Sequence, residues 1–481
     1  MKRNKLYILS AAALTAALIL TGCSGRPAAQ TESAPTGEDA IDQETAFDNF
    51  TRQLFEEIAS SDTMTLHYML SDPEAFGITP GEVTLGGYPS EWDQEDYDST
   101  KEEYETLKSF DLSQLTERQQ LDHEILMEVF ENELAYNTRD LFYYREPLTA
   151  TSGDHTFLPV DFAEYTFYDK GDVEDYLTLL ADVPDYFADV LAFEQAKSEA
   201  GLFMSDESVD EVVEACETFI EDPDNNALIE VFPDKLTELS GLTEDEIRDF
   251  TDRNTAAVKE KVIPAYQDLI DGMTALKGTG KNEWGIGKFE HGADYYEGLI
   301  RTKAGVDMSA EELLDYLDDE LNKDYMRLIF LVKQHPEAYE KLYDMPEINL
   351  DEPEEMLEAL ITAIKEEYPD PVTDKYTVKY VHPSLEENLN PAFYMIPPVD
   401  DPDHNVIYLN NSHLEDSLEV FTTLAHEGYP GHLYQVTWQM NSDAAPVILQ
   451  LAPLGYTEGW ATYVETNPMD GADWMKALMK C

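Results

Sequence analysis

The chain has 481 residues, of which 31 are Lys or Arg and 100 are Asp or Glu, so its formal charge is −69. A surface of this sign repels phosphate backbones and anionic headgroups, which argues against nucleic-acid binding and a polybasic membrane contact. With 43% hydrophobic residues the chain can bury a core, and its three cysteines exclude a disulfide-built scaffold.

The first 46 residues have the pattern of an export and anchoring segment. Basic residues precede an apolar run that ends in Leu20-Thr21-Gly22-Cys23. The run is shorter than the about 20 residues of a spanning helix, so we interpret residues 1–22 as a lipoprotein signal peptide and Cys23 as the lipidated residue. The alternative is an ordinary anchor helix. Residues 23–46 read as a flexible tether, which predicts an extracytoplasmic protein attached to a membrane by its N-terminal lipid.

Residues 47–481 have mostly helical apolar spacing, and we expect them to form one large, mainly α domain. Capping boxes at Thr243–Glu246 and Ser309–Glu312 each predict a helix start. The first helix should kink at Pro264. The second carries an apolar stripe that is more typical of a core face than of a cofactor site, formed by Leu313, Leu314, Leu317, Leu321, Tyr325 and Leu328.

Three stretches, residues 144–161, 277–292 and 376–411, break the helical pattern. The last contains a short β-type run, Asn405–Asn410, between turn-prone residues, and it predicts a strand. Two cysteines remain in the body of the chain, Cys216 and Cys481, and nothing in the sequence pairs them.

The densest group of metal-ligand residues is His426, Glu427 and His432, at the end of a predicted apolar helix. In the zinc peptidase signature the two His lie four residues apart, so both imidazoles reach one ion and the Glu between them holds a water. Here the spacing is six, which on a straight helix places the second His on the wrong face. Pro430 must break the helix, and Gly431, free to adopt an unusual φ, could return His432 towards His426.

A third ligand is expected from the next predicted helix, because a His-His-Glu zinc site takes a carboxylate from a later helix and leaves a position for water. Glu458 is the first choice. Glu465 lies near the same helical face and would orient a His or remain a solvated charge. The residues alone leave open a hydrogen-bonded His pair without metal. Another His-Glu pair, His123-Glu124, is followed by no further His and is interpreted as part of a surface helix.

These residues resemble a known family. His426-Glu-Gly-Tyr-Pro-Gly-His432 and Glu458-Gly-Trp-Ala-Thr-Tyr463 are similar to the paired H-E-x-x-P-G-H and E-G-W-x-x-Y motifs of the bacterial domain of unknown function 885 family. Further similar segments cover the chain from about Phe47 to its end. Members of this family look like distant relatives of the helical gluzincin metallopeptidases, such as the angiotensin-converting enzyme and Taq carboxypeptidase groups.

The resemblance implies a fold and a chemistry. It implies a large helical metallopeptidase-like fold with a short β element beside the active-site cleft. It also implies a Zn²⁺ ion bound by His426, His432 and Glu458, with Glu427 as the general base that takes a proton from the metal-activated water.

The resemblance also implies where a substrate lies. The predicted strand at Val406–Asn410, with Tyr408 and Asn410, would run beside an extended peptide and lend it backbone hydrogen bonds. Family members continue further than Cys481, through helices that close the cleft and supply oxyanion donors, so this chain looks truncated. Tyr456 and Tyr463 are the two candidates to replace those donors in part.

Together these observations predict a membrane-anchored, zinc-dependent hydrolase of peptides or other small amides, with no nucleic-acid partner. One alternative is a non-catalytic solute-binding or scaffolding lipoprotein, although such proteins usually alternate strands and helices in two lobes, and this alternation is absent here. The other is a metal hydrolase of non-peptide amides or esters, which the same ligands would serve.

Overall fold

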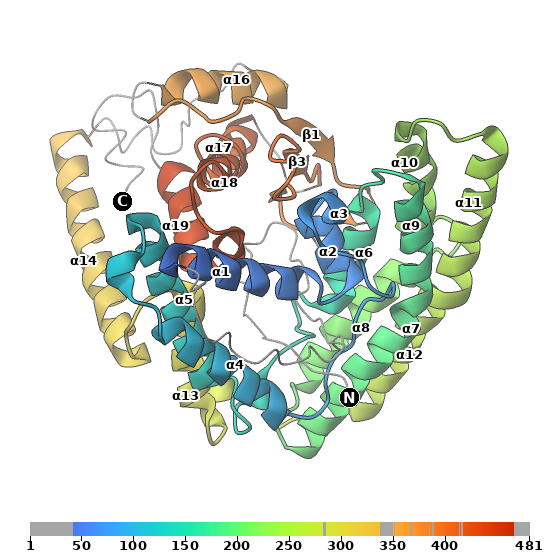
Figure 1. Cartoon of the computed structure of the whole chain (residues 1–481), viewed down its shortest axis with the longest axis horizontal. Coiled ribbons are helices and arrows are strands. Elements are labelled where there is room, and N and C mark those ends of the chain that lie inside the picture. Colours follow the sequence, from blue (N-terminus) through green and yellow to red (C-terminus); the bar gives the residue numbers. More distant parts are fainter. Residues whose placement is uncertain are drawn as a thin grey trace.

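The computed structural model describes residues 42–465, except for residues 282–284, 337–349, 351, 366–367, 384, 387–388, 413 and 415–416. The described chain is mainly helical with one small sheet, which confirms the predicted fold class (Figure 1). The predicted signal peptide, the lipidation site Cys23 and Cys481 all lie outside the described residues. Asp42 caps α1 (Gln43–Ala59), so residues 43–46, assigned above to the tether, are helical.

Helices follow one another along most of the described chain. The first group is α1, α2 (Thr63–Met69), α3 (Pro73–Phe76), α4 (Gln94–Lys108), α5 (Glu117–Tyr136), α6 (Asp154–Glu164), α7 (Lys170–Glu199), α8 (Asp206–Ile220), α9 (Ala227–Glu230), α10 (Phe232–Glu238), α11 (Glu244–Ala257) and α12 (Ile263–Leu276). The second group is α13 (Gly292–Leu299), α14 (Ala310–Gln334), α16 (Pro353–Ile364), α17 (Ser417–Glu427), α18 (His432–Met440) and α19 (Leu454–Glu465).

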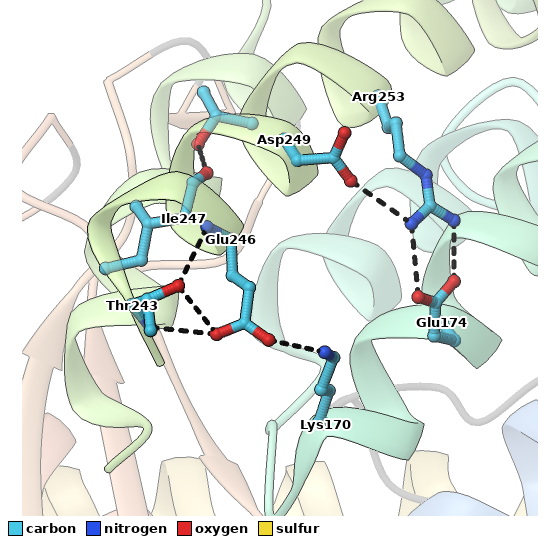
Figure 2. Close-up of polar contacts among 8 residues, drawn as sticks. Lys170, Glu174, Thr243, Glu246, Ile247, Asp249 and Arg253 are labelled. Carbon is cyan, nitrogen blue, oxygen red and sulfur yellow. Dashed lines mark hydrogen bonds and ion pairs between the residues drawn. The ribbon is translucent and has the colours of Figure 1, made fainter. Parts of the chain in front are cut away.

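The predicted capping box at the start of α11 is present and also joins α11 to α7 (Figure 2). The Thr243 hydroxyl accepts a hydrogen bond from the Glu246 N–H, and the Glu246 carboxylate accepts one from the Thr243 N–H at 2.9 Å. The Glu246 carboxylate also accepts from Lys170 at 2.7 Å, and Arg253 forms two bonds to Glu174. The bond from Lys170, followed by those from Thr243, lowers the pKa of Glu246 to about 2.

The irregularity predicted near Pro264 is present. α11 passes into a π-helical turn, Val258–Val262, and Pro264 lies in the first turn of α12. Proline has no N–H to donate to the preceding turn. The regular α-helical bonding is therefore interrupted here, and one π-helical turn takes its place.

The first stretch predicted to be non-helical is wrong in its second half, because α6 begins at Asp154 and continues through Pro159. A proline inside a helix leaves the carbonyl four residues earlier without its usual partner. Here that carbonyl belongs to His155, and it accepts a hydrogen bond from the Tyr266 hydroxyl at 2.9 Å. A side chain from α12, distant in sequence, therefore lets α6 continue. Among the described residues of the second stretch there is a 3₁₀ turn, Ile286–Lys288.

The third stretch contains the sheet, with strands β1 (Thr377–Tyr380), β2 (Ala392–Met395) and β3 (Val406–Leu409) in the order β1-β3-β2. β3, the predicted strand, pairs in parallel with β1 and antiparallel with β2. Successive side chains of a strand point to opposite faces of the sheet, so the two faces of β3 pack into different hydrophobic cores. Ile407 and Leu409 pack with side chains of α16, α17 and α18, whereas Val406 and Tyr408 pack with the large core built on α6, α7, α8 and α12.

A third core joins the beginning of the described chain to residues near its end. Phe47 of α1 packs in one cluster with Val447 from the 3₁₀ turn Pro446–Gln450. A polar contact also joins distant parts of the chain. The Asp400 carboxylate accepts hydrogen bonds from the backbone N–H groups of Ser71 and Asp72 at 2.7 and 2.8 Å. The loop between β2 and β3 is thus fixed to the N-terminal helices.

The capping box at Ser309–Glu312 starts α14 as predicted, but the expected burial of its apolar stripe is wrong. None of the residues of α14 is buried, and Leu314, Leu317, Leu321 and Tyr325 are each more than half exposed. The helix stands at one edge of the molecule (Figure 1). Its contacts within the described chain do not cover the stripe. In the part of the chain that the structure describes, no helix is long and apolar enough to cross a membrane.

Candidate metal centre

The predicted helix break lies between the two candidate histidine ligands. α17 ends at Glu427, residues 428–431 leave the helix, and α18 begins at His432. Pro430 offers no N–H to the carbonyl four residues before it. The chain turns back so that the Tyr434 N–H donates to the Gly428 carbonyl at 3.2 Å.

Gly431 is needed at this break for a different reason from the predicted one. Its φ is −76°, which other residues also adopt. However, a Cβ atom at this position would lie 1.7 Å from the His426 carbonyl oxygen and 2.5 Å from that of Ala425. Gly431 therefore permits a close backbone contact, and this contact brings the start of α18 against the end of α17.

The break directs both imidazoles at one carboxylate on α19. His426 Nε2 lies 3.3 Å from Glu458 Oε2, and His432 Nε2 lies 3.5 Å from Glu458 Oε1. The imidazole centroids are 4.8 Å apart and the rings are nearly perpendicular. One nitrogen or oxygen from each of the three residues lies within 4.8 Å of the others, and no other group of His, Cys, Asp and Glu in the described chain meets this condition.

The charges of this cluster depend on one another. Burial opposes the charged form of Glu458, but the bonds from His426 and His432 outweigh it and lower the carboxyl pKa to about 2. Burial likewise opposes the charged form of His426, and the bonds to Glu458 and Glu465 raise its pKa to about 10. The two imidazoles and the Glu458 carboxylate therefore attract one another.

Two residues of α19 fix the orientation of the cluster. Glu465 Oε2 lies 3.1 Å from His426 Nδ1, on the opposite side of the ring from Glu458. A carboxylate in this position fixes which ring nitrogen of a ligating His faces a metal. The indole N–H of Trp460 donates to the Pro430 carbonyl at 2.8 Å, so α19 is joined directly to the helix break. The sequence pattern alone gave Trp460 no role. Its position on the same predicted helix as Glu458, two residues later, was the feature that could have indicated one.

Glu427 is buried beside the cluster, and burial raises the pKa of its carboxyl to about 8. The backbone N–H of Tyr394, on β2, opposes this rise in pKa only in part. Within the described chain its Oε2 atom is buried without a hydrogen-bond partner. An unpaired buried carboxylate oxygen is costly, so this atom is available to a group that enters the site.

Comparison with known proteins places this geometry in a family. The family model described as "Bacterial protein of unknown function (DUF885)" matches residues 75–475, most of the chain and the whole cluster. The chain belongs to this family. No curated protein matches it.

Two solved structures are similar to this DUF885 protein. A candidate lipoprotein from Colwellia psychrerythraea has a TM-score of 0.75 and 17% sequence identity, over 92% of this chain and 81% of that one. A candidate lipoprotein of unknown function from Shewanella oneidensis has a TM-score of 0.49 and 16% identity, over 92% of this chain and 80% of that one. The first shows that the fold is shared.

The structure corrects the expectation that β3 runs beside a substrate. β3 is the central strand, and its two edges already pair with β1 and β2. The Tyr408 ring stacks on Phe393 and packs with the large core, on the opposite face of the sheet from α17. The Asn410 amide donates to the carbonyls of Glu386 and Leu389 and holds a loop in place. The DUF885 fold therefore uses both residues away from the cluster.

The remaining candidate residues lie at two other places. Tyr463, on α19, is 53% exposed and its ring centroid is 6.3 Å from that of Trp460. His123, interpreted above as part of a surface helix, is instead buried in α5, where its Nε2 lies 3.0 Å from the Leu107 carbonyl oxygen. It serves the packing of α5 against the end of α4.

Proposed function

We propose that this DUF885 protein is a zinc-dependent hydrolase, and that its substrates are peptides. The observation that carries the proposal is the convergence of His426, His432 and Glu458. Two imidazoles and one carboxylate are the donor set of catalytic zinc sites that keep a position for water. The unpartnered buried Oε2 atom of Glu427 fits the same interpretation, because a general base must reach the water beside the metal.

The residues of the chain have distinct roles in this proposal. Zinc, when bound, supplies a Lewis acid and lowers the pKa of its water. Glu427 accepts a proton and returns it to the leaving amine. Glu465 holds the ring of His426, and Trp460 holds the helix break.

The proposal includes a location outside the cytoplasm, attached to a membrane by lipid on Cys23. The signal pattern that ends in this cysteine supports it, and the similar fold of the candidate lipoprotein from Colwellia psychrerythraea agrees with it. The unmodified protein should incorporate labelled fatty acid, and Cys23→Ala should not. Absence of label from the unmodified protein would favour an ordinary anchor helix.

The metal is tested by plasma mass spectrometry on residues 24–481 purified without chelator. We expect about one zinc per chain, by the ligand set of a single site. His432→Ala should lower zinc to background, and His404→Ala, at a more exposed histidine beside Asp401, should not. If the unmodified chain contained zinc only at the background level, His426 and His432 would be interpreted as hydrogen-bond partners of Glu458 and not as zinc ligands.

Catalysis is tested separately, with a panel of peptide and ester substrates assayed with and without chelator. Glu427→Gln should keep its zinc and lose turnover, because the amide cannot accept the proton. Unchanged turnover in this variant would remove Glu427 from the mechanism. Cleavage of esters but not of peptides would replace the peptidase by a hydrolase of non-peptide substrates.

A further inference from the structure

The strongest unexplained surface of the protein is the apolar stripe of α14, outside the metal centre. The stripe consists of Leu314, Leu317, Leu321 and Tyr325, which lie on one side of the helix because their spacing is three or four residues. Each of them is 53% to 60% exposed. A contiguous apolar surface of this kind on a soluble protein usually marks a contact site.

The charges of α14 are segregated along its length. The residues from Ala310 to Glu320 include six acids and no base, whereas those from Leu321 to Gln334 include three bases and one acid. Two copies of this helix in parallel would place acid against acid. Two copies in antiparallel orientation would place each acidic half along the other's basic half, which selects this arrangement.

We propose that α14 forms an isologous, antiparallel contact with α14 of a second copy of this chain. The twofold axis passes near Leu321, close to the middle of the helix, so Leu321 of each copy faces its counterpart. A helix of 25 residues is about 37 Å long and about 10 Å wide. Two such helices side by side bury on the order of 1,000 Å², about the lower limit for a stable interface.

Two neighbouring features fit this contact. Arg327 is on the surface, beside the stripe, and among the described residues it pairs with Asp324, three residues earlier on the same helix. Such exposed pairs are weak and exchange partners at little cost. The helix also stands at the edge of the molecule (Figure 1).

Sedimentation equilibrium on residues 24–481 with Cys481→Ser tests the association at micromolar concentration. We expect a dimer that Leu321→Glu weakens by about 100-fold or more, because two like charges then face each other. Leu112→Glu, at another exposed leucine, should leave the dimer unchanged. Because Leu321 is exposed, the variant should keep its circular dichroism spectrum. A monomeric parent chain, or a Leu321→Glu variant that remains dimeric, overturns the proposal.

Disulfide trapping in the same background tests the orientation. Leu321→Cys should cross-link two copies under mild oxidation, and Leu314→Cys should not, because it lies far from its counterpart in an antiparallel pair. Cross-linking of Leu314→Cys with itself contradicts the antiparallel arrangement. A monomer in which Cys at position 321 resists alkylation shows that residues of the same chain cover the stripe, and this result also overturns the proposal.

Discussion

Replacement of Gly431 by alanine tests whether the close backbone contact builds the metal centre. The new Cβ would lie 1.7 Å from the His426 carbonyl oxygen, whereas a carbon-to-oxygen contact is normally about 3.3 Å. The end of α17 or the start of α18 must therefore move by about 1.6 Å. Metal–ligand distances tolerate about 0.2 Å, so this variant should lose zinc. Overpacking should also destabilise the fold by about 1–3 kcal/mol or more.

Gly459→Ala is the matched control, since Gly459 directly follows Glu458 on α19 and an added Cβ would meet nothing within 4 Å. Alanine in a helix is favoured over glycine by about 1 kcal/mol, so this variant should be more stable and keep its zinc. Urea unfolding of the metal-free proteins measures stability, and plasma mass spectrometry measures zinc. Our reasoning fails if Gly431→Ala matches the parent chain in both measurements, or if Gly459→Ala loses zinc equally.

Three further predictions concern stability and site geometry. Burial raises the pKa of Glu133 to about 8 from an ordinary 4.5, so the folded state retains a proton that the unfolded state releases. Its contribution to stability therefore falls as pH rises through this range, by about 1.4 kcal/mol per pH unit. Glu133→Gln should remove part of that slope in urea unfolding at pH 5 and pH 8, and an unchanged slope would contradict it. Trp460→Phe loses the bond to the Pro430 carbonyl and should weaken zinc binding about tenfold in a competition titration. Trp438→Phe, at an exposed tryptophan, should leave zinc binding unchanged. If both substitutions weakened zinc binding equally, Trp460 would have no specific role in positioning the site. Thr243→Ala removes the cap of α11 and should cost about 1 kcal/mol in urea unfolding, whereas Thr243→Ser should restore it. If Thr243→Ala left the free energy of unfolding unchanged, the Thr243 side chain would not be needed to cap α11.

The features that the sequence predicts correctly are mostly local. The capping boxes at Thr243 and Ser309 need only residues within one turn. The break after Glu427 follows from one missing N–H, at Pro430. The strand at Val406–Leu409 follows from a short β-type run between turns. Such features depend on a few adjacent residues, so the sequence of one short segment is enough to predict each of them.

The features that the sequence does not predict depend on distant partners. α6 continues through Pro159 because Tyr266, more than a hundred residues later, bonds the freed carbonyl. β3 is the central strand because β2 occupies the edge that a substrate was expected to use. The role of Gly431 depends on how closely two helices approach, which a spacing pattern does not contain. Glu458 was the first choice for a third ligand because it lies on a later helix, but its contact with both imidazoles depends on how α19 packs against α17 and α18.

The core that joins α1 to the turn at Pro446–Gln450 has a consequence for synthesis of the protein. Phe47 leaves the ribosome roughly 400 residues before Val447, its partner in that core. At about 5–20 residues per second, the apolar face of α1 waits about 20 to 80 seconds for its partner. Until the chain has been made and has crossed the membrane, as the proposed location requires, that face is exposed to other unfolded chains. A factor that covers α1 during synthesis and export should therefore raise the yield of folded protein more than one that acts only afterwards.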